Sequence, residues 1–521
     1  MEVTQALMGF SSCPDTGRSR RKSLERIEQE NGAQRLKRTL GPVQLTMLGV
    51  GSTIGAGIYV MTGTAAANYA GPSILLSFIV AGLACLFTAL SYGELASAMP
   101  VSGSAYTYAY VSMGEAYAWA VGWLLLLEYG ISCAGVAAGF SGYAVSLLQD
   151  FGIQIPHGLT TTTLRVIFDS AGRHISSGSQ LDLVGAFSIL VVTVLLIFGV
   201  KESLRINTAI VFLKVGVLAV FVALGLWQIH PAYWTPFIPP HEGGFRYGIP
   251  GIFRAASIIF FAYVGFEAVS TASSEARNPR RDIPVGIVLS LLICTAVYMI
   301  VAAVLIGVVP WRLLDVGDPL AVAVNAMHQP WLAFFVKIGA VIGLCSVLFG
   351  LLYAQSRIFF AMAEDGLLMP LFCTLHPRFC TPWIGTILLG VVVAIATATL
   401  PIDIISDLVS LGTATAFGIV CFTVIWIRNT APESPRAFSV PGGGFTVKGM
   451  WIGYVPLMGI LFCLIMAAPL FIDMIFALFS GDPVPATLLA VYCFCGWVSY
   501  RFYGRKHSRL GLEQAEREGV V

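Results

Sequence analysis

Long apolar stretches alternate with short polar connections from residue 42 to residue 503. Most of the stretches reach or approach the roughly 20 residues that a helix needs to cross the hydrocarbon core of a bilayer. Windows of this length with so few charges are typical of transmembrane helices. We predict twelve spans, at residues 42–68, 73–98, 114–148, 183–200, 206–228, 250–274, 284–309, 330–362, 384–400, 404–427, 452–478 and 485–503. The pattern therefore predicts an all-α integral membrane protein.

The connections and tails divide the chain into five parts. If spans one to five form one unit and spans six to ten another, each span of the first unit has a counterpart in the second. The predicted parts are a basic N-terminal tail (1–40), a first five-helix unit (41–228), a second five-helix unit (229–427), an inner linker with the last two helices (428–503) and a C-terminal tail (504–521).

The composition excludes a soluble protein. Of the 521 residues, 57% are hydrophobic and 11% are charged, so we expect the chain to lie in a lipid bilayer. A net charge of +2 gives no indication of a nucleic acid partner. The 11 cysteines are scattered, with neither zinc-ligand spacing nor the framework of a disulfide-rich secreted protein. No Ser-His-Asp set, carboxylate dyad or His/Cys cluster is visible, so we expect no metal, no cofactor and no enzyme activity.

Lysine and arginine are distributed unevenly between the two sides of the predicted membrane. With the N-terminus inside, the inner connections and tails hold 22 of the 30 Lys and Arg residues, and the outer connections hold four. By the positive-inside rule, both termini should be cytoplasmic. The first 40 residues are polar and show no cleavable signal peptide. Residues 23–38 are predicted either to form an amphipathic helix on an anionic membrane surface or to be a solvated basic tail.

A glycine-rich stretch interrupts the first span. Residues Gly49 to Gly57 hold four glycines, each weakening a helix by about 1 kcal/mol relative to alanine, together with Ser52 and Thr53. A spanning helix tolerates such a weak middle only where it is buried or lines a cavity. We interpret the stretch as a break that leaves free N–H groups and a half-helix N-terminus at mid-membrane, which suits a carboxylate. The alternatives are close packing through small residues and a phosphate loop, for which the βαβ unit and the Gly-Lys-Ser/Thr are missing.

The sixth span holds a second, weaker interruption. Residues 260–267 mix aromatic side chains with Gly265 and Glu267 in mid-span, and Glu267 is predicted to cap or brace the break. Interrupted helices in matching positions of two halves are the best sequence indicator of the central site of a transporter. The two interruptions together predict a substrate site at the centre of the membrane.

Two charged residues lie deep in predicted spans. Lys214 is eight residues from the inner end of span five, about 12 Å deep at 1.5 Å per residue, which is beyond the reach of its side chain. An unpaired ammonium there gives up its proton readily, so Lys214 is the leading candidate for proton coupling. A fixed charge, or a lysine bonded to carbonyl groups of the first break, is the alternative. Glu128, near the middle of span three, is predicted to bind a cationic substrate group, pair with Lys214, share a proton or play a structural role.

Several motifs resemble one transporter family, and they recur in order over residues 36–500. They are LKRTLGPVQLTMLGVGSTIGAGI (36–58), SYGELA (91–96), GSAYTY (103–108), GWLLLLEY (122–129), FAYVGFEAVS (261–270), EARNPRRDIP (275–284), SRIFFAMAEDGLL (356–368) and DLVSLGT (407–413). The chain resembles the cationic amino acid transporter family of the amino acid–polyamine–organocation superfamily, in its bacterial type.

This resemblance implies a fold and a substrate site. The fold is the 5+5 inverted repeat of twelve transmembrane helices, with helices 1 and 6 broken. The substrate α-carboxylate is implied to meet N–H groups of the first break and Thr53, and the α-amine to meet carbonyl groups of both breaks. In the family, a lysine matching Lys214 is tied to proton coupling, and residues of the eighth span tune side-chain specificity. The implied substrate-binding residues are Val50, Gly51, Ser52, Thr53, Ile54, Gly55, Ala56, Gly57, Phe260, Phe261, Ala262, Tyr263, Leu344, Cys345 and Ser346, to which the intramembrane position adds Glu128.

We therefore expect secondary active uptake of an L-amino acid, coupled to protons, by alternating access across a bacterial cytoplasmic (inner) membrane. The closest alternative is an exchanger of amino acids, including cationic amino acids or polyamines. Glu128 favours a cationic substrate. A non-transporting amino acid sensor is the alternative from another class. The preferred amino acid stays open, as does the binding of a small single-span membrane partner.

Overall fold

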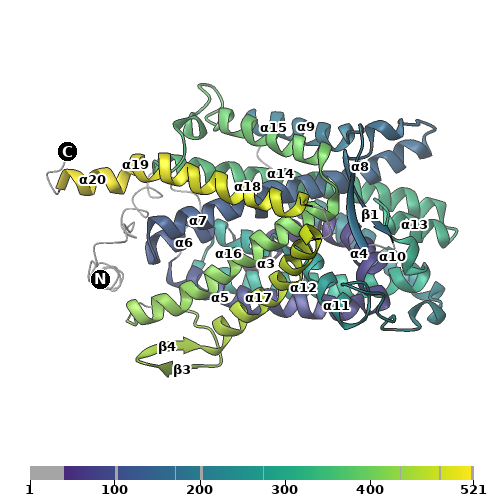
Figure 1. Cartoon of the computed structure of the whole chain (residues 1–521), viewed down its shortest axis with the longest axis horizontal. Coiled ribbons are helices and arrows are strands. Elements are labelled where there is room, and N and C mark those ends of the chain that lie inside the picture. Colours follow the sequence, from purple (N-terminus) through teal and green to yellow (C-terminus); the bar gives the residue numbers. More distant parts are fainter. Residues whose placement is uncertain are drawn as a thin grey trace.

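The computed structural model describes residues 40–99, 104–169, 172–199, 204–273, 275–433, 436–479 and 483–517. The predicted N-terminal tail, with the candidate surface helix at residues 23–38, lies outside the described residues except for Leu40. Helices dominate the described chain, and most of the long ones run along or obliquely to the long axis of the molecule (Figure 1).

The α-helices are α3 (Pro42–Thr53), α4 (Thr62–Ala65), α5 (Ile74–Ala98), α6 (Ser104–Ser112), α7 (Glu115–Leu125), α8 (Ser132–Asp150), α9 (Leu183–Ile197), α10 (Leu204–Gly225), α11 (Gly248–Ile259), α12 (Pro279–Val308), α13 (Pro319–Ala326), α14 (Pro330–Glu364), α15 (Trp383–Thr399), α16 (Ile402–Thr430), α17 (Tyr454–Phe479), α18 (Val484–Val498), α19 (Arg505–His507) and α20 (Arg509–Arg517). The π-helical turns are η1 (Gly57–Met61), η2 (Ala66–Ala70), η4 (Leu126–Ile131) and η12 (Ser499–Gly504). The 3-10 turns are η3 (Gly71–Ser73), η5 (His157–Leu159), η6 (Leu226–Gln228), η7 (Pro231–Trp234), η8 (Phe260–Tyr263), η9 (Phe266–Ala272), η10 (Trp311–Leu313) and η11 (Pro370–Cys373).

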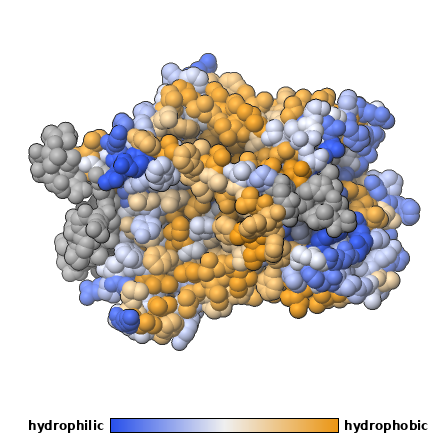
Figure 2. Space-filling model, in the orientation of Figure 1, coloured by the Kyte–Doolittle hydropathy of each residue, from blue (hydrophilic) through white to orange (hydrophobic). Residues whose placement is uncertain are grey.

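Apolar helices of spanning length make the chain a multi-pass membrane protein. Within the described residues, eight helical runs are long and apolar enough to cross a membrane, and each predicted span overlaps a helix. The eight runs are Gly57–Ala98, Glu115–Asp150, Asn207–Gln228, Gly248–Ala272, Pro279–Val308, Pro330–Glu364, Ile402–Thr430 and Tyr454–Phe479. The shorter apolar helices α9 and α15 occupy the predicted fourth and ninth spans. Figure 2 shows a broad hydrophobic surface across the middle of the molecule and bluer surfaces at its two ends.

Two small hairpins occupy connections for which we predicted no strands, and the second of them extends two residues into the predicted span 452–478. β1 (Leu164–Asp169) pairs antiparallel with β2 (Gly172–Ser177) in the loop after α8, and β3 (Gly444–Val447) pairs with β4 (Met450–Gly453) before α17. The β3–β4 turn places Lys448 and Gly449 at positive φ (50° and 83°), as a two-residue type I′ turn requires. Strands this short carry a weak alternation signal, which explains why the sequence did not reveal them.

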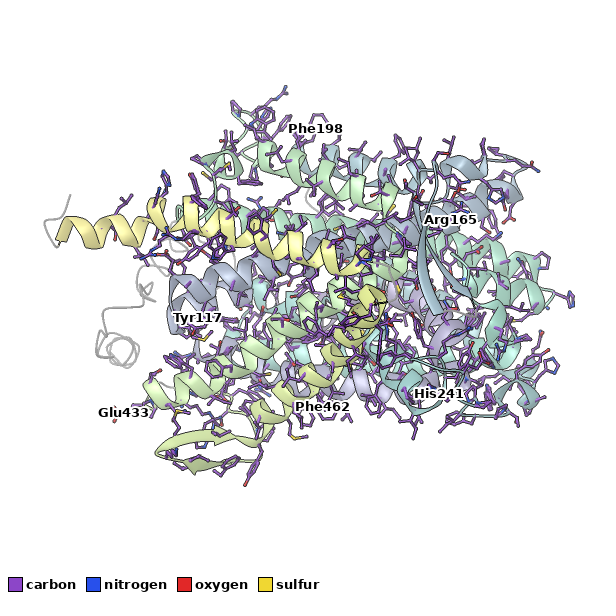
Figure 3. The ribbon with its side chains drawn as sticks, in the orientation of Figure 1. Tyr117, Arg165, Phe198, His241, Glu433 and Phe462 are labelled. Carbon is purple, nitrogen blue, oxygen red and sulfur yellow. The ribbon has the colours of Figure 1, made fainter. Side chains whose placement is uncertain are left out.

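The long helices pack so that labelled residues of the predicted outer connections lie towards one end of the molecule and a residue of the predicted inner linker lies at the other. α12 packs against α5 and α3, α14 against α8, and α17 against α16. Arg165 and His241, both in predicted outer connections, lie towards one end of the molecule, and Glu433, in the predicted inner linker, lies at the other (Figure 3). The hairpins β1–β2 and β3–β4 likewise lie at opposite ends (Figure 1).

Candidate functional site

The first helix is interrupted, over a shorter segment than the glycine-rich stretch that predicted the break. α3 continues through Gly49 and Gly51 to Thr53 and ends at Ile54, whose ψ of 96° is extended. The helix resumes as the π-helical turn η1, which begins at Gly57. The first N–H groups of a helix have no partner inside it, so the start of η1 presents free donors next to the break.

The sixth predicted span is interrupted after η8. Val264 is extended, with a ψ of 129°, and Gly265 has a φ of 120°, after which η9 begins. A Cβ added at Gly265 would lie 2.6 Å from the carbonyl oxygen of Ser52, so this position requires glycine for its conformation and for space.

The two breaks lie side by side and are tied together by hydrogen bonds. The Ser52 hydroxyl donates to the carbonyl oxygen of Gly265 at 2.8 Å. The Tyr298 hydroxyl, from α12, bridges both breaks by approaching the carbonyl oxygens of Thr53 (2.7 Å) and Ala262 (3.0 Å). A Cβ added at Gly57 would overlap Ala262, so the chains touch there.

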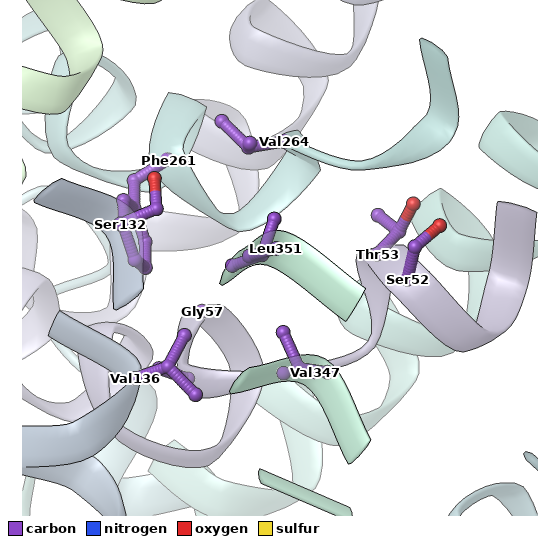
Figure 4. A pocket seen from close by; sticks show the side chains of 11 residues that line it. Ser52, Thr53, Gly57, Ser132, Val136, Phe261, Val264, Val347 and Leu351 are labelled. Atoms are coloured by element: carbon purple, nitrogen blue, oxygen red, sulfur yellow. The ribbon is translucent and has the colours of Figure 1, made fainter. Parts of the chain in front are cut away.

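A small, partly open cavity with a volume of about 10 Å³ lies between the breaks. Figure 4 shows residues of both breaks, of α8 and of α14 around it. The lining residues are Ser52, Thr53, Gly55, Ala56, Gly57, Ser132, Val136, Phe261, Val264, Val347 and Leu351. This space is enough for about one water molecule, so the segments around the cavity must move apart before an amino acid can bind.

The cavity has a polar end and an apolar wall. Its polar end is the backbone of the first break, and its wall is made by Val136, Phe261, Val347 and Leu351. The Thr53 hydroxyl donates to the carbonyl oxygen of Gly49 at 2.7 Å, so its proton is engaged within its own helix. Backbone N–H groups at the start of η1 are therefore the better placed donors for a carboxylate.

Lys214 is buried and reaches the first break. Its Nζ donates to the carbonyl oxygens of Gly51 (3.0 Å) and Ile54 (3.2 Å), which lie on either side of the point where α3 ends. The stem of the side chain packs against Gly343, where an added Cβ would lie 3.0 Å from two of its carbons. The ammonium group thus occupies carbonyl oxygens that the interrupted helix leaves without N–H partners.

Glu128 and Glu267, the two acids that the sequence analysis singled out, lie outside the lining of the cavity. Glu267 caps the second break, as predicted, because both of its carboxyl oxygens accept the Gly265 N–H, at 3.1 and 3.0 Å. Glu128 is fully buried on η4, one turn before Ser132. The Lys214 ammonium and the Glu128 carboxyl group do not form an ion pair in this structure.

The cavity includes some of the predicted substrate-binding residues and leaves others outside its lining. Those that line it are Ser52, Thr53, Gly55, Ala56, Gly57 and Phe261. Those that lie outside the lining are Val50, Gly51, Ile54, Phe260, Ala262, Tyr263, Glu128, Leu344, Cys345 and Ser346. Of the second group, Gly51, Ile54 and Ala262 still act at the breaks through their carbonyl oxygens.

Sequence reasoning predicted Phe261 in the apolar wall but missed Val136, Val347 and Leu351, although the resemblance placed specificity residues on the helix that holds Val347 and Leu351. Val347 and Leu351 are four residues apart on α14, and Ser132 and Val136 are four apart on α8, so each pair lies on one face of its helix. This spacing was visible, but the spans are apolar on every side. No pattern in the sequence separates a valine that faces the cavity from one that faces lipid.

Comparison with known proteins identifies the family. The family of the amino acid permeases matches residues 40–496. The chain belongs to this family, which is part of the amino acid–polyamine–organocation superfamily.

Its relatives are permeases and transporters. The branched-chain amino acid permease BcaP of Bacillus subtilis (strain 168) is 38% identical over 493 residues, which cover 94% of this chain and 98% of BcaP. The methylthioribose transporter of the same organism is 38% identical over 491 residues, with the same coverage. The vacuolar cationic amino acid transporter 4 of Arabidopsis thaliana is 36% identical over 416 residues, or 80% of this chain and 67% of that protein. These relatives are named as carriers of solutes, not as enzymes.

Among the residues that the structure describes, no three or more His, Cys, Asp or Glu side chains form a group that could hold a metal ion.

Proposed function

We propose that this permease takes up a small neutral amino acid with an apolar side chain, coupled to protons. The observation that carries the proposal is the cavity between the two breaks, which joins a polar backbone end to an apolar wall. An amino acid with an apolar side chain has matching parts, because its α-carboxylate and α-amine are charged and its side chain is not.

The α-carboxylate would bind the N–H groups at the start of η1, near Ala56 and Gly57. A half-helix N-terminus favours an anion electrostatically, and here the N–H groups border the cavity. The α-amine would bind carbonyl oxygens of the two breaks, as the resemblance to cationic amino acid transporters implied.

The wall favours an apolar side chain over a cationic one. No lysine, arginine, aspartate or glutamate is among the lining residues, and Glu128 lies outside the lining. Burying a guanidinium or ammonium group there without a partner would be costly. BcaP, which is named as a branched-chain amino acid permease, supports the same choice.

Lys214 would couple proton movement to the first break. With its proton, Nζ holds the carbonyl oxygens of Gly51 and Ile54 together. Loss of the proton would remove a charge and weaken these bonds, so the end of α3 could rearrange. Protonation and the shape of the binding cavity would then depend on each other.

Alternating access would complete the cycle. We propose the twelve-helix, 5+5 inverted-repeat fold, in which spans one, two, six and seven rock against three, four, eight and nine. Both termini would be cytoplasmic, in the inner membrane of a bacterium. Whether a small single-span protein binds is left to experiment.

Uptake into proteoliposomes tests the proposal. Labelled leucine, valine, arginine and methylthioribose would be offered with and without an inward proton gradient. A one-unit pH gradient corresponds to about 1.4 kcal/mol, so a one-proton symporter can accumulate its substrate about tenfold. We expect accumulation of leucine or valine, and its loss in Lys214→Ala. Lys337→Ala is the matched control, because Lys337 is also buried in a span but pairs with Asp150 on α8 (2.7 Å).

The other outcomes are informative. Flux that needs preloaded amino acid and ignores pH would indicate an exchanger and give Lys214 a structural role. Preference for arginine would overturn the apolar substrate. Binding of an amino acid without either gradient-driven uptake or exchange would favour the non-transporting sensor.

A further inference from the structure

The helix of the last predicted span turns one face towards the rest of the protein. This inward face consists of residues spaced four apart, and residues at this spacing lie on one side of a helix. They are Tyr492, Gly496, Tyr500, Gly504 and Ser508. Figure 1 shows α18, α19 and α20 following one another along the molecule to one of its ends. The opposite face of this segment therefore points away from the protein.

Two stacked tyrosines hold the inward face against α7. The rings of Tyr492 and Trp123 stack with their centroids 5.3 Å apart. The rings of Tyr500 and Trp119 stack at 5.7 Å. The Trp123 indole N–H also donates to the carbonyl oxygen of Tyr492, at 3.2 Å. These contacts fix the rotation of the helix about its own axis.

Hydrogen bonds continue this anchoring beyond the last span. The Ser508 hydroxyl donates to the carboxyl group of Glu115, and both side chains are buried. The Arg509 N–H donates to the carbonyl oxygen of Asp365, directly after α14, at 3.1 Å. A Cβ added at Gly366 would lie 2.2 Å from the carbonyl oxygen of His507, so the two chain segments touch there. The inward face is thus docked as far as the start of α20.

The outward face carries a row of aromatic side chains. Phe494, Trp497 and Phe502 are each more than half exposed. The Trp497 ring centroid lies 6.1 Å from that of Phe494 and 6.4 Å from that of Phe502, so the three rings form a continuous row. Exposed aromatic residues are typical of the level at which a membrane-spanning helix meets the lipid headgroups. The row therefore places the membrane–water interface near the end of this span.

Basic side chains take over where the aromatic row ends. Arg501, Arg505, Lys506 and Arg509 are all exposed, and the sequence from residue 499 to residue 512 holds no acidic residue. In the part of the chain that the structure describes, none of the four pairs with an acidic side chain. Figure 2 shows a strongly hydrophilic patch where α19 lies in Figure 1, bordering hydrophobic surface.

We propose that this outward face, from Phe494 to Arg509, binds anionic phospholipids. The headgroup phosphate binds the basic side chains, and the acyl chains lie along the aromatic row. A cluster of lysine and arginine directly after a membrane span attracts anionic lipid, and a guanidinium group can hold a phosphate through two parallel hydrogen bonds. Because the inward face is docked, the four charges are held at the interface.

The aromatic row favours a lipid over a free phosphate ion. A free phosphate would use the four charges alone and would have no contact with Phe494 or Trp497, which lie within the predicted span. A phospholipid matches both parts of the face, because its headgroup is anionic and its acyl chains are apolar. The basic and aromatic parts lie in the order that a lipid at the end of a span requires.

Native mass spectrometry of the purified full-length protein tests this surface without any transport assay. Phosphatidylglycerol and phosphatidylethanolamine with the same acyl chains would be titrated separately, and we expect the wild type to bind phosphatidylglycerol more tightly. Each Lys or Arg near an anionic surface strengthens binding about fivefold, so Arg505→Gln/Lys506→Gln should weaken phosphatidylglycerol binding about 25-fold. The matched control is Arg280→Gln/Arg281→Gln, which removes two exposed charges from another predicted inner connection and should leave this binding unchanged.

Three results would overturn the proposal. The first is equal binding of the two lipids by the wild type, a comparison that needs no variant to fold. The second is an equal loss of affinity in both double variants, which would mean diffuse attraction to the whole inner surface. The third is displacement of phosphatidylglycerol by an equal concentration of inorganic phosphate, which would indicate a phosphate site that does not use the acyl chains.

Discussion

At the scale of single residues, the site depends on glycines, which have no Cβ atom, as much as on the side chains that form hydrogen bonds. Gly57 and Gly265 let two interrupted helices approach until their backbones touch. Tyr298 and Ser52 then hold the breaks through hydrogen bonds to carbonyl oxygens. Small changes at these positions should therefore have large effects on transport.

Gly57→Ala should abolish uptake. The added methyl group would overlap Ala262, and forcing extra carbon into a packed interior costs about 1–3 kcal/mol. The control is Gly350→Ala on α14, where an added Cβ has no atom within 4 Å. Substrate uptake and thermal unfolding of both variants would be measured. Full uptake by Gly57→Ala would mean that the breaks can separate freely.

Tyr298→Phe should weaken substrate binding and lower stability. The variant removes a hydroxyl that serves two buried carbonyl oxygens, one in each break, at a cost of about 1–3 kcal/mol. Isothermal titration with the preferred amino acid, together with unfolding in detergent, would measure both effects. An unchanged affinity would show that the hydroxyl bridge is incidental to the site.

At the scale of elements, buried ion pairs join helices whose apolar surfaces alone would not determine their packing partners. Arg254 on α11 forms two hydrogen bonds with Asp407 on α16, both at 2.8 Å, and two with Asp473 on α17, at 3.1 and 3.0 Å. The Tyr69 ring lies 5.0 Å from the guanidinium. Lipid tails are as apolar as leucine, so polar contacts of this kind are what make helix partners specific.

Asp407→Asn should destabilise the protein more than Asp473→Asn. Asp407 is almost completely buried, and breaking a buried pair costs about 3–5 kcal/mol. The Asp473 side chain is 20% exposed and accepts both of its bonds on one carboxyl oxygen, whereas Asp407 uses both oxygens, so the loss of Asp473 should cost less. Thermal unfolding of the two variants in the same detergent would compare them. Equal stability of both would contradict this ranking.

At the scale of the whole molecule, the positive-inside rule and the structure lead to one test of orientation. Arg165 and Glu433 lie towards opposite ends of the molecule (Figure 3). Arg165→Cys should react with a membrane-impermeant maleimide in intact cells, whereas Glu433→Cys should react only after the cells are opened. Both variants would be made together with Cys380→Ser, because Cys380 is exposed in a predicted inner connection and would itself react once the cells are opened. Labelling of Glu433→Cys in intact cells would reverse the orientation.

Much of the helical arrangement could be predicted, whereas the details of the site could not. Every predicted span overlaps a helix, because a bilayer forces the backbone to satisfy its own hydrogen bonds over about 20 residues. The glycine-rich stretch located the first break, but its position at Ile54 and Gly55 depends on the partners at Gly265 and Ala262. Val136, Val347 and Leu351 of the apolar wall were missed because apolar side chains that face the cavity and those that face lipid look alike in a sequence.

The sequence by itself determined that this is a multi-pass membrane protein with two weak helices and a deep lysine, because these features follow from local hydrophobicity, glycine content and charge. Only the tertiary structure decided which groups meet. Lys214 bonds with carbonyl oxygens of the first break, and Glu267 caps the second by accepting the Gly265 N–H. Such pairings depend on how helices far apart in the chain pack and on which face each helix turns inward. Because these helices are apolar on every face, the sequence does not show which face that is.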